Sequence, residues 1–157
     1  MNIYILIMKF LINYTGKVEN KNLIYRADEF SFDMYPRTHL IDFEVAINTL
    51  TLAIIENQVV HLSGFCGLRK DMKRNYDIPE NKEGLLKVTG NFESGLCYRI
   101  NKEDWPVHIN IHTGWVCIGN PTESFQSVEF IKNCVAVLNH KGNIMSLWLK
   151  PDKLPKL

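Results

Sequence analysis

Residues 134–151, C-V-A-V-L-N-H-K-G-N-I-M-S-L-W-L-K-P, carry the clearest local structure in the chain. Two short apolar runs, rich in Val, Ile, Leu and Trp, flank residues 140–143, and such runs favour strands over a helix. Gly142 and Asn143 accept positive φ readily, which is typical of a tight turn. Pro151 has no N–H to donate, so it ends the ladder. This stretch predicts an antiparallel hairpin.

A second hairpin is predicted over residues 105–120, with its turn at Thr113 and Gly114. Its first arm alternates between apolar and polar residues, as a half-buried antiparallel strand does. We expect one face to carry Val107, Ile109 and Ile111, and the other to carry His108, Asn110 and His112.

Residues 41–65 fit two structures. Apolar residues recur there at helical spacing and Asp42 suits a helix N-cap, so a helix over 42–55, in an α+β fold, is the alternative. The segment is nevertheless rich in β-branched residues, which lose side-chain freedom in a helix and fit a pleated surface. We therefore predict one strand up to Ile55, a turn at Glu56 and Asn57, and a return strand through Phe65.

Further strands are predicted at 3–14, 22–26, 84–89 and 96–100, whereas Pro36 argues against a regular inner strand within 30–40.

Residues 120–123 predict the beginning of a short helix, with Asn120 as its N-cap and with Phe125, Val128 and Ile131 on its buried side. Residues 68–83 predict a polar surface loop, and residues 150–157 an extended tail. The fold class expected is mainly β: antiparallel hairpins in a sandwich or open barrel, with at most one or two short helices.

The chain has 157 residues, of which 46% are hydrophobic and 22% are charged. This size and composition predict a single globular domain, 1–157. The net charge of +1 argues against a nucleic-acid partner, because proteins that bind nucleic acids usually carry an excess of basic residues.

The apolar N-terminal run is interrupted by Lys9 and is too short for a membrane helix, so we read it as a strand, with either Met1 or Met8 as the true start.

The four cysteines are scattered and no two of them form a C-x-x-C motif, so we expect free thiols, a cytoplasmic protein and no metal or other cofactor.

His108 and His112 are four positions apart, which on a strand places them about 13 Å from each other, so they cannot chelate one ion. Cys66 lies between glycine-rich neighbours. His61 would face the opposite side of a regular strand from Cys66. Glu129 sits between Val128 and Phe130.

The weak catalytic candidates are therefore His108, Glu129 and Cys66. The binding candidates are a basic cluster with nearby aromatic residues, namely Arg69, Lys70, Lys73, Arg74, Tyr76 and Trp115. No nucleotide-binding or hydrolase motif occurs. We expect a non-catalytic, soluble protein-binding domain, of inhibitor or immunity type, whose partner is a protein or a second copy and not a membrane. The alternative is a small enzyme or ligand-binding β-barrel with a pocket lined by His, Glu and Cys.

Overall fold

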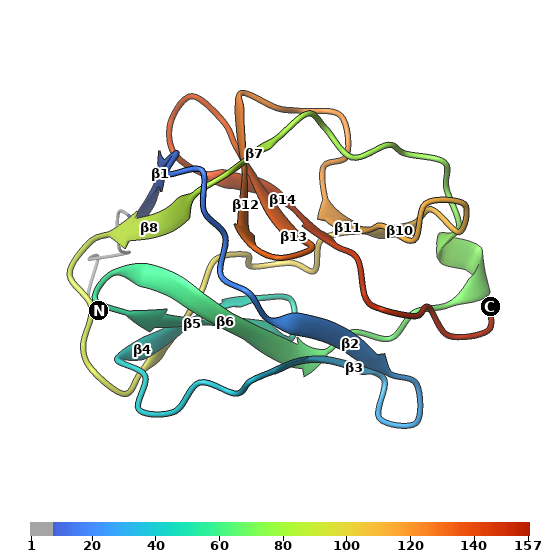
Figure 1. The fold of residues 1–157 in the computed structure, drawn as a ribbon, viewed down its shortest axis with the longest axis horizontal. Helices are drawn as coiled ribbons and strands as arrows, with labels where there is room; N and C mark the ends of the chain where they lie inside the picture. The colour runs from blue at the N-terminus through green and yellow to red at the C-terminus, as the bar shows by residue number, and fades with distance from the viewer. Residues whose placement is uncertain (1–7) are drawn as a thin grey trace.

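The computed structural model describes residues 8–157, which fold into two β-sheets that face one another (Figure 1). The first sheet comprises β1 (Lys9–Asn13), β2 (Asn22–Arg26), β3 (Ser31–Tyr35), β4 (Phe43–Ile47), β5 (Leu50–Ile55), β6 (Gln58–Phe65), β8 (Leu85–Thr89) and β9 (Cys97–Arg99). The second comprises β7 (Lys82–Glu83), β10 (Val107–Ile109), β11 (Val116–Gly119), β12 (Gln126–Ile131), β13 (Cys134–Leu138) and β14 (Ile144–Leu149). One 3-10 turn, η1 (Lys70–Met72), is the helical element of this part of the chain. The mainly-β prediction is confirmed.

The order of the first sheet is β1-β8-β6-β5-β4-β9, with β3 joined to the end of β6 and β2 paired with β3. The order of the second is β10-β11-β14-β13-β12-β7. Neighbouring strands are antiparallel except for β4 with β9 and β12 with β7. β8 meets β6 at a single residue pair, Gln58 and Lys87, so the sheet curls and lifts β1 and β8 towards the second sheet (Figure 1).

The inner faces of both sheets share one hydrophobic core. Leu50, Leu52 and Ile54 of β5 and Val128 of β12 are fully buried in it. β13 is buried on both faces because the chain near residues 76–78 crosses the outer face of the second sheet. There Tyr76, Ile78 and Trp115 cover the buried residues Cys117, Val135, Val137 and Trp148.

The hairpin predicted within residues 134–151 is formed by β13 and β14, with Cys134 opposite Leu149. Gly142 has φ +78, as expected, whereas Asn143 does not adopt positive φ. The Asn139 side chain stabilises the turn, since its Oδ1 accepts hydrogen bonds from the backbone N–H of Lys141 and of Asn143.

The prediction for residues 41–65 needs one correction. No helix forms at 42–55, and the predicted first arm is two strands, β4 and β5, that turn back on each other at Asn48 and Thr49. Asn48 has φ +54, which asparagine adopts more readily than most residues. The turn at Glu56 and Asn57 is confirmed, and both residues have positive φ.

Three smaller predictions also changed. The hairpin at 105–120 forms from β10 and β11, but Ile111 lies in its turn and is exposed, because the strand ends at Ile109. No helix follows Asn120; its Oδ1 does accept from the N–H groups of Thr122 and Glu123, yet the chain enters β12 directly. A strand, β3, does form within 30–40, and it ends immediately before Pro36.

Of the strand predicted at 3–14, the structure forms β1 (Lys9–Asn13). The part of that prediction within residues 1–7 lies outside the described residues. The tail after β14 forms no strand, but Pro151 is buried and Leu154 and Leu157 pack against the core.

Candidate functional site

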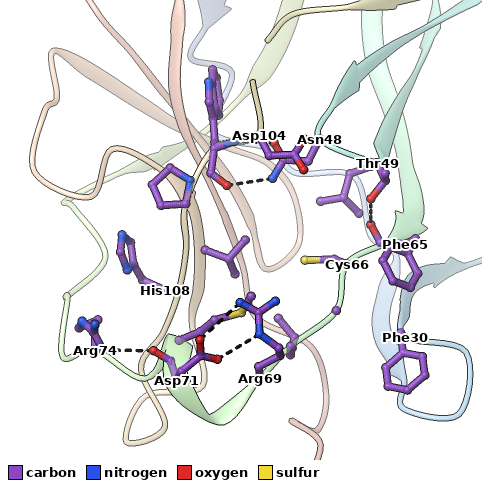
Figure 2. Close-up of a pocket in the computed structure, with 17 residues that line it drawn as sticks. Phe30, Asn48, Thr49, Phe65, Cys66, Arg69, Asp71, Arg74, Asp104 and His108 are labelled. Atoms are coloured by element: carbon purple, nitrogen blue, oxygen red, sulfur yellow. Dashed lines mark hydrogen bonds and ion pairs between the residues drawn. The ribbon is translucent and has the colours of Figure 1, made fainter. Parts of the chain in front are cut away.

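A cleft of about 730 Å³ lies beside the end of β6, at Phe65 (Figure 2). Four segments line it: Phe30, the β4–β5 turn, residues 65–74 that contain η1, and residues 104–108 that lead into β10. Both sheets contribute to its walls. We call this hollow the inter-sheet cleft.

Asn48 fixes one wall of the inter-sheet cleft. Its Oδ1 accepts from the backbone N–H of Trp105 at 2.8 Å, and its Nδ2 donates to the carbonyl of Trp105 at 3.1 Å (Figure 2). The same Oδ1 accepts from Nδ2 of Asn101 at 2.6 Å. A turn of the first sheet is therefore hydrogen-bonded to the segment that enters the second sheet.

Tyr25 fixes the opposite wall. Its hydroxyl donates to the carbonyl of Cys66 at 2.7 Å and accepts from the N–H of Leu68 at 3.3 Å. The N–H of Cys66 donates to the carbonyl of Phe30 at 2.8 Å. These bonds connect the β2–β3 turn to the chain that follows β6.

Two exposed aromatic rings line the inter-sheet cleft beside this wall. Phe30 and Phe65 are 53% and 54% exposed, and their rings meet edge to face with centroids 6.4 Å apart (Figure 2). Phe30 has φ +53, a conformation that costs a bulky residue free energy. Because about half of each ring is exposed, neither ring is fully used in the core, and aromatic residues are enriched at protein interfaces.

Two residues of the predicted basic cluster, Arg69 and Arg74, line the inter-sheet cleft, whereas Lys70 and Lys73 do not. Arg69 forms an ion pair with Asp71 at 3.1 Å, while the Arg74 guanidinium donates to the carbonyls of Asp71 and Lys73. Within residues 8–157 no carboxylate lies within ion-pair distance of Arg74 or of the exposed Lys70. The remaining carboxylate of the lining, Asp104, pairs with Arg99 at 2.8 Å. The lining itself is thus balanced, with two arginines and two aspartates, and the excess of positive charge comes from Lys70 and Arg99 beside it.

The other predicted binding residues do not line the cleft. Lys73 donates to the carbonyl of Leu157 at 3.4 Å. Tyr76 stands edge to face with the ring of His108, with centroids 5.0 Å apart, and its other contacts are with the cluster that includes Trp115. Tyr76 and Trp115 thus help to cover the outer face of the second sheet.

The structure brings two of the three catalytic candidates to the same cleft. Cys66 and His108 both line it, and Figure 2 shows the Cys66 sulfur directed towards its interior. Burial raises the pKa of the Cys66 thiol to about 12, so the thiol stays protonated near pH 7 and is a poor nucleophile. Burial, and then the charge of Arg74, lower the pKa of His108, so its imidazole is neutral.

Glu129 lies elsewhere. It lines a separate hollow with Tyr14, Asn81 and Lys82, and its Oε2 accepts from the N–H of Asn133 at 2.8 Å. That bond stabilises the β12–β13 turn, where Asn133 has φ +64. Glu129 therefore does not join Cys66 and His108 in one catalytic arrangement.

His61 and Cys66 lie in different hollows, as their odd spacing on a strand predicts. His61 lines a hollow on the outer face of the first sheet, where its Nδ1 lies 3.0 Å from Nζ of Lys21. All four cysteines are free, and Cys97 alone of the four is exposed. In residues 8–157 no group of three His, Cys, Asp or Glu side chains is placed to hold a metal ion.

The sequence did not point to Phe30, Phe65 or Asn48. Phe30 and Phe65 are 35 positions apart, and they meet because Ser31 pairs with Phe65 across β3 and β6. A turn signal before β3 was the available clue, since Asp28 and Glu29 are typical of a surface turn.

None of the helical structure in residues 8–157 is long and apolar enough to span a membrane. In comparisons with known proteins, the chain matches no protein-family model and no curated protein sequence.

Proposed function

We propose that this protein is a non-catalytic binding domain that docks a segment of a partner protein in the inter-sheet cleft. The occupant that fits is an extended acidic segment that carries an aromatic or aliphatic anchor beside a carboxylate. The exposed Phe30–Phe65 pair is the observation that carries the proposal, because exposed rings beside a preformed cleft are what an apolar anchor contacts.

Charge complementarity supports an acidic partner. Arg69 and Arg74 line the cleft and Lys70 stands next to them, whereas Asp71 and Asp104 each already have an arginine partner. A carboxylate in the occupant would pair with Arg74, which has only carbonyl partners for its side chain in the described chain. Arginine binds carboxylates well because its planar fork matches their geometry.

No observation of comparable weight supports the alternative that the protein is a small enzyme. The Cys66 thiol is protonated and Glu129 lies in a different hollow. The two carboxylates of the cleft lining, Asp71 and Asp104, are each paired with an arginine. An inhibitor or immunity-type role is the form of partner binding that we favour for a domain of this size.

The test is a displayed library of random peptides, selected on the purified protein and then measured by isothermal titration. We expect enriched peptides to combine an aromatic or aliphatic residue with Asp or Glu. Phe65→Ala should weaken their binding by about tenfold or more, as loss of an aromatic anchor does. Phe125→Ala is the matched control, because Phe125 is also exposed and stands edge to face with another ring, that of His140, yet does not line the cleft.

Arg74→Gln should weaken the same peptides and reduce the salt dependence of their affinity. The proposal is wrong if no peptide is enriched, or if the enriched peptides bind Phe65→Ala as tightly as the unchanged protein. It is also wrong if the protein forms a dimer that Phe65→Ala dissociates, since a second copy would then be the occupant.

A further inference from the structure

A second hollow, of about 250 Å³, lies on the outer face of the first sheet beneath residues 37–41. The residues of its lining that matter here are Asp33, Arg37, Thr38, Glu44, Thr51 and His61. None of them contributes to the inter-sheet cleft. We call it the outer pocket.

Behind the outer pocket lies a buried lysine that has no ion-pair partner in the part of the chain that the structure describes. Lys21 is 5% exposed, and its ammonium donates to the carbonyl of Pro36 at 2.9 Å, to the hydroxyl of Thr38, and to Nδ1 of His61 at 3.0 Å. All three partners are neutral, and in residues 8–157 no carboxylate lies within ion-pair distance of Nζ. A buried charge is costly unless an opposite charge is near it.

The lysine also fixes the tautomer of His61. An ammonium group can only donate, so Nδ1 of His61 must be the acceptor and its Nε2 must carry the proton. His61 is 8% exposed, and no acceptor within the described residues takes the Nε2–H. Because the ring lines the outer pocket, that pocket is where the Nε2–H can meet an acceptor.

Two arginines, Arg26 and Arg37, lie at the edge of the outer pocket and share one aspartate. Arg37 lines the outer pocket and donates to Oδ2 of Asp33 at 2.7 Å, and Arg26 lies 3.6 Å from the same oxygen. One carboxylate is thus shared by two guanidinium groups. Glu44 is the other carboxylate of the lining. The exposed Glu19 attracts Lys21, and the exposed Glu29 attracts Arg26 and Arg37, but neither lies within ion-pair distance of these cations.

We propose that the outer pocket binds a small oxyanion, a phosphate or carboxylate group, whose oxygen accepts the Nε2–H of His61 and pairs with Arg37. The anion supplies negative charge near the buried Lys21, which has no ion-pair partner within residues 8–157. This site is independent of the inter-sheet cleft, so either proposal can fail without the other.

The experiment follows the ¹⁵N signals of the His61 side chain by NMR at pH 7 while sodium phosphate or sodium acetate is added at constant ionic strength. Sodium chloride serves as the reference salt. We expect a saturable shift with at least one of the two oxyanions. Saturation with phosphate alone indicates a tetrahedral phosphate group as the ligand, and saturation with acetate alone indicates a carboxylate.

Three variants make the test specific. Arg37→Gln should weaken oxyanion binding about fivefold or more, because it removes a charge-assisted hydrogen bond. Glu44→Gln should strengthen binding, because it removes a like charge from the lining. Arg99→Gln is the matched control, since Arg99 also pairs with an aspartate at 2.8 Å but lies outside the outer pocket. A shift that does not saturate, or that is unchanged in Arg37→Gln, overturns the proposal.

Discussion

The ammonium of Lys21 lies 3.0 Å from Nδ1 of His61, and both side chains are buried. This contact joins the beginning of β2 to the middle of β6, which are 40 positions apart in the sequence. Protonation of His61 would place two positive charges side by side, so the imidazole stays neutral. Burial, and then the charge of Lys21, lower the pKa of His61 to about 4.

This pKa makes stability depend on pH in a defined window. Between about 6.5 and about 4 the unfolded chain binds a proton on His61 that the folded protein does not bind. The free energy of unfolding should therefore fall as the pH drops through that window, by on the order of 3 kcal/mol. Urea unfolding at several pH values measures it. His61→Gln keeps an acceptor for Lys21 but cannot titrate, so it should show a smaller fall; an equal fall in both proteins contradicts the assignment.

Gly142→Val should destabilise the protein by at least about 1 kcal/mol. Gly142 has φ +78, and an added Cβ would approach the carbonyl oxygen of Phe10 to 3.0 Å. Gly16→Val is the control, because Gly16 has φ +73 but nothing lies near its Cβ position. Thermal unfolding should show a larger loss for Gly142→Val than for Gly16→Val; the reverse order would mean that the contact with β1 is unimportant.

Phe30→Gly should be more stable than Phe30→Ala by about 1 kcal/mol. Both substitutions remove the ring, but only glycine relaxes the strain at φ +53. Chemical unfolding of the two variants measures the difference. Equal stabilities would show that the turn relaxes without strain when the ring is absent.

Alkylation by iodoacetamide at pH 8 should modify one thiol of the folded protein quickly. Burial raises the pKa of all four thiols, but Cys97 alone of the four is exposed to the reagent. Intact mass should therefore rise by one adduct, and Cys97→Ser should abolish the rapid reaction. Rapid modification of Cys97→Ser would show that Cys66 is more reactive in its cleft than its burial allows.

Local sequence patterns predicted those parts of the fold that local interactions determine. The hairpins at β10–β11 and β13–β14 carry glycine at the turn positions with positive φ, so their residues specify them directly. The turn at Asn48 and Thr49 was missed because it interrupts a continuous apolar run, and a lone Asn in such a run is a weak turn signal.

The sites were less predictable because they depend on pairing between distant strands. The basic residues of the inter-sheet cleft were identified as binding candidates from their composition. The aromatic pair was not, since Phe30 and Phe65 become neighbours only through the short β3–β6 ladder. Lys21 and His61 are also distant, at 40 positions apart in the chain, and neither stands in a motif. Glu129 was read as a candidate acid because no local pattern shows that its partner is the N–H of Asn133.

The division of the chain between the two sheets has a practical consequence. Every strand before the exposed residues 102–104 belongs to the first sheet except β7, and every strand after them belongs to the second (Figure 1). A cut at that loop would yield two fragments, each with a nearly entire sheet and one bare apolar face. β7 would remain on the first fragment, where it could pair with β12 of the second fragment. We expect the two fragments, when brought together, to rebuild the core that both sheets share, which is the arrangement that a split-protein reporter needs.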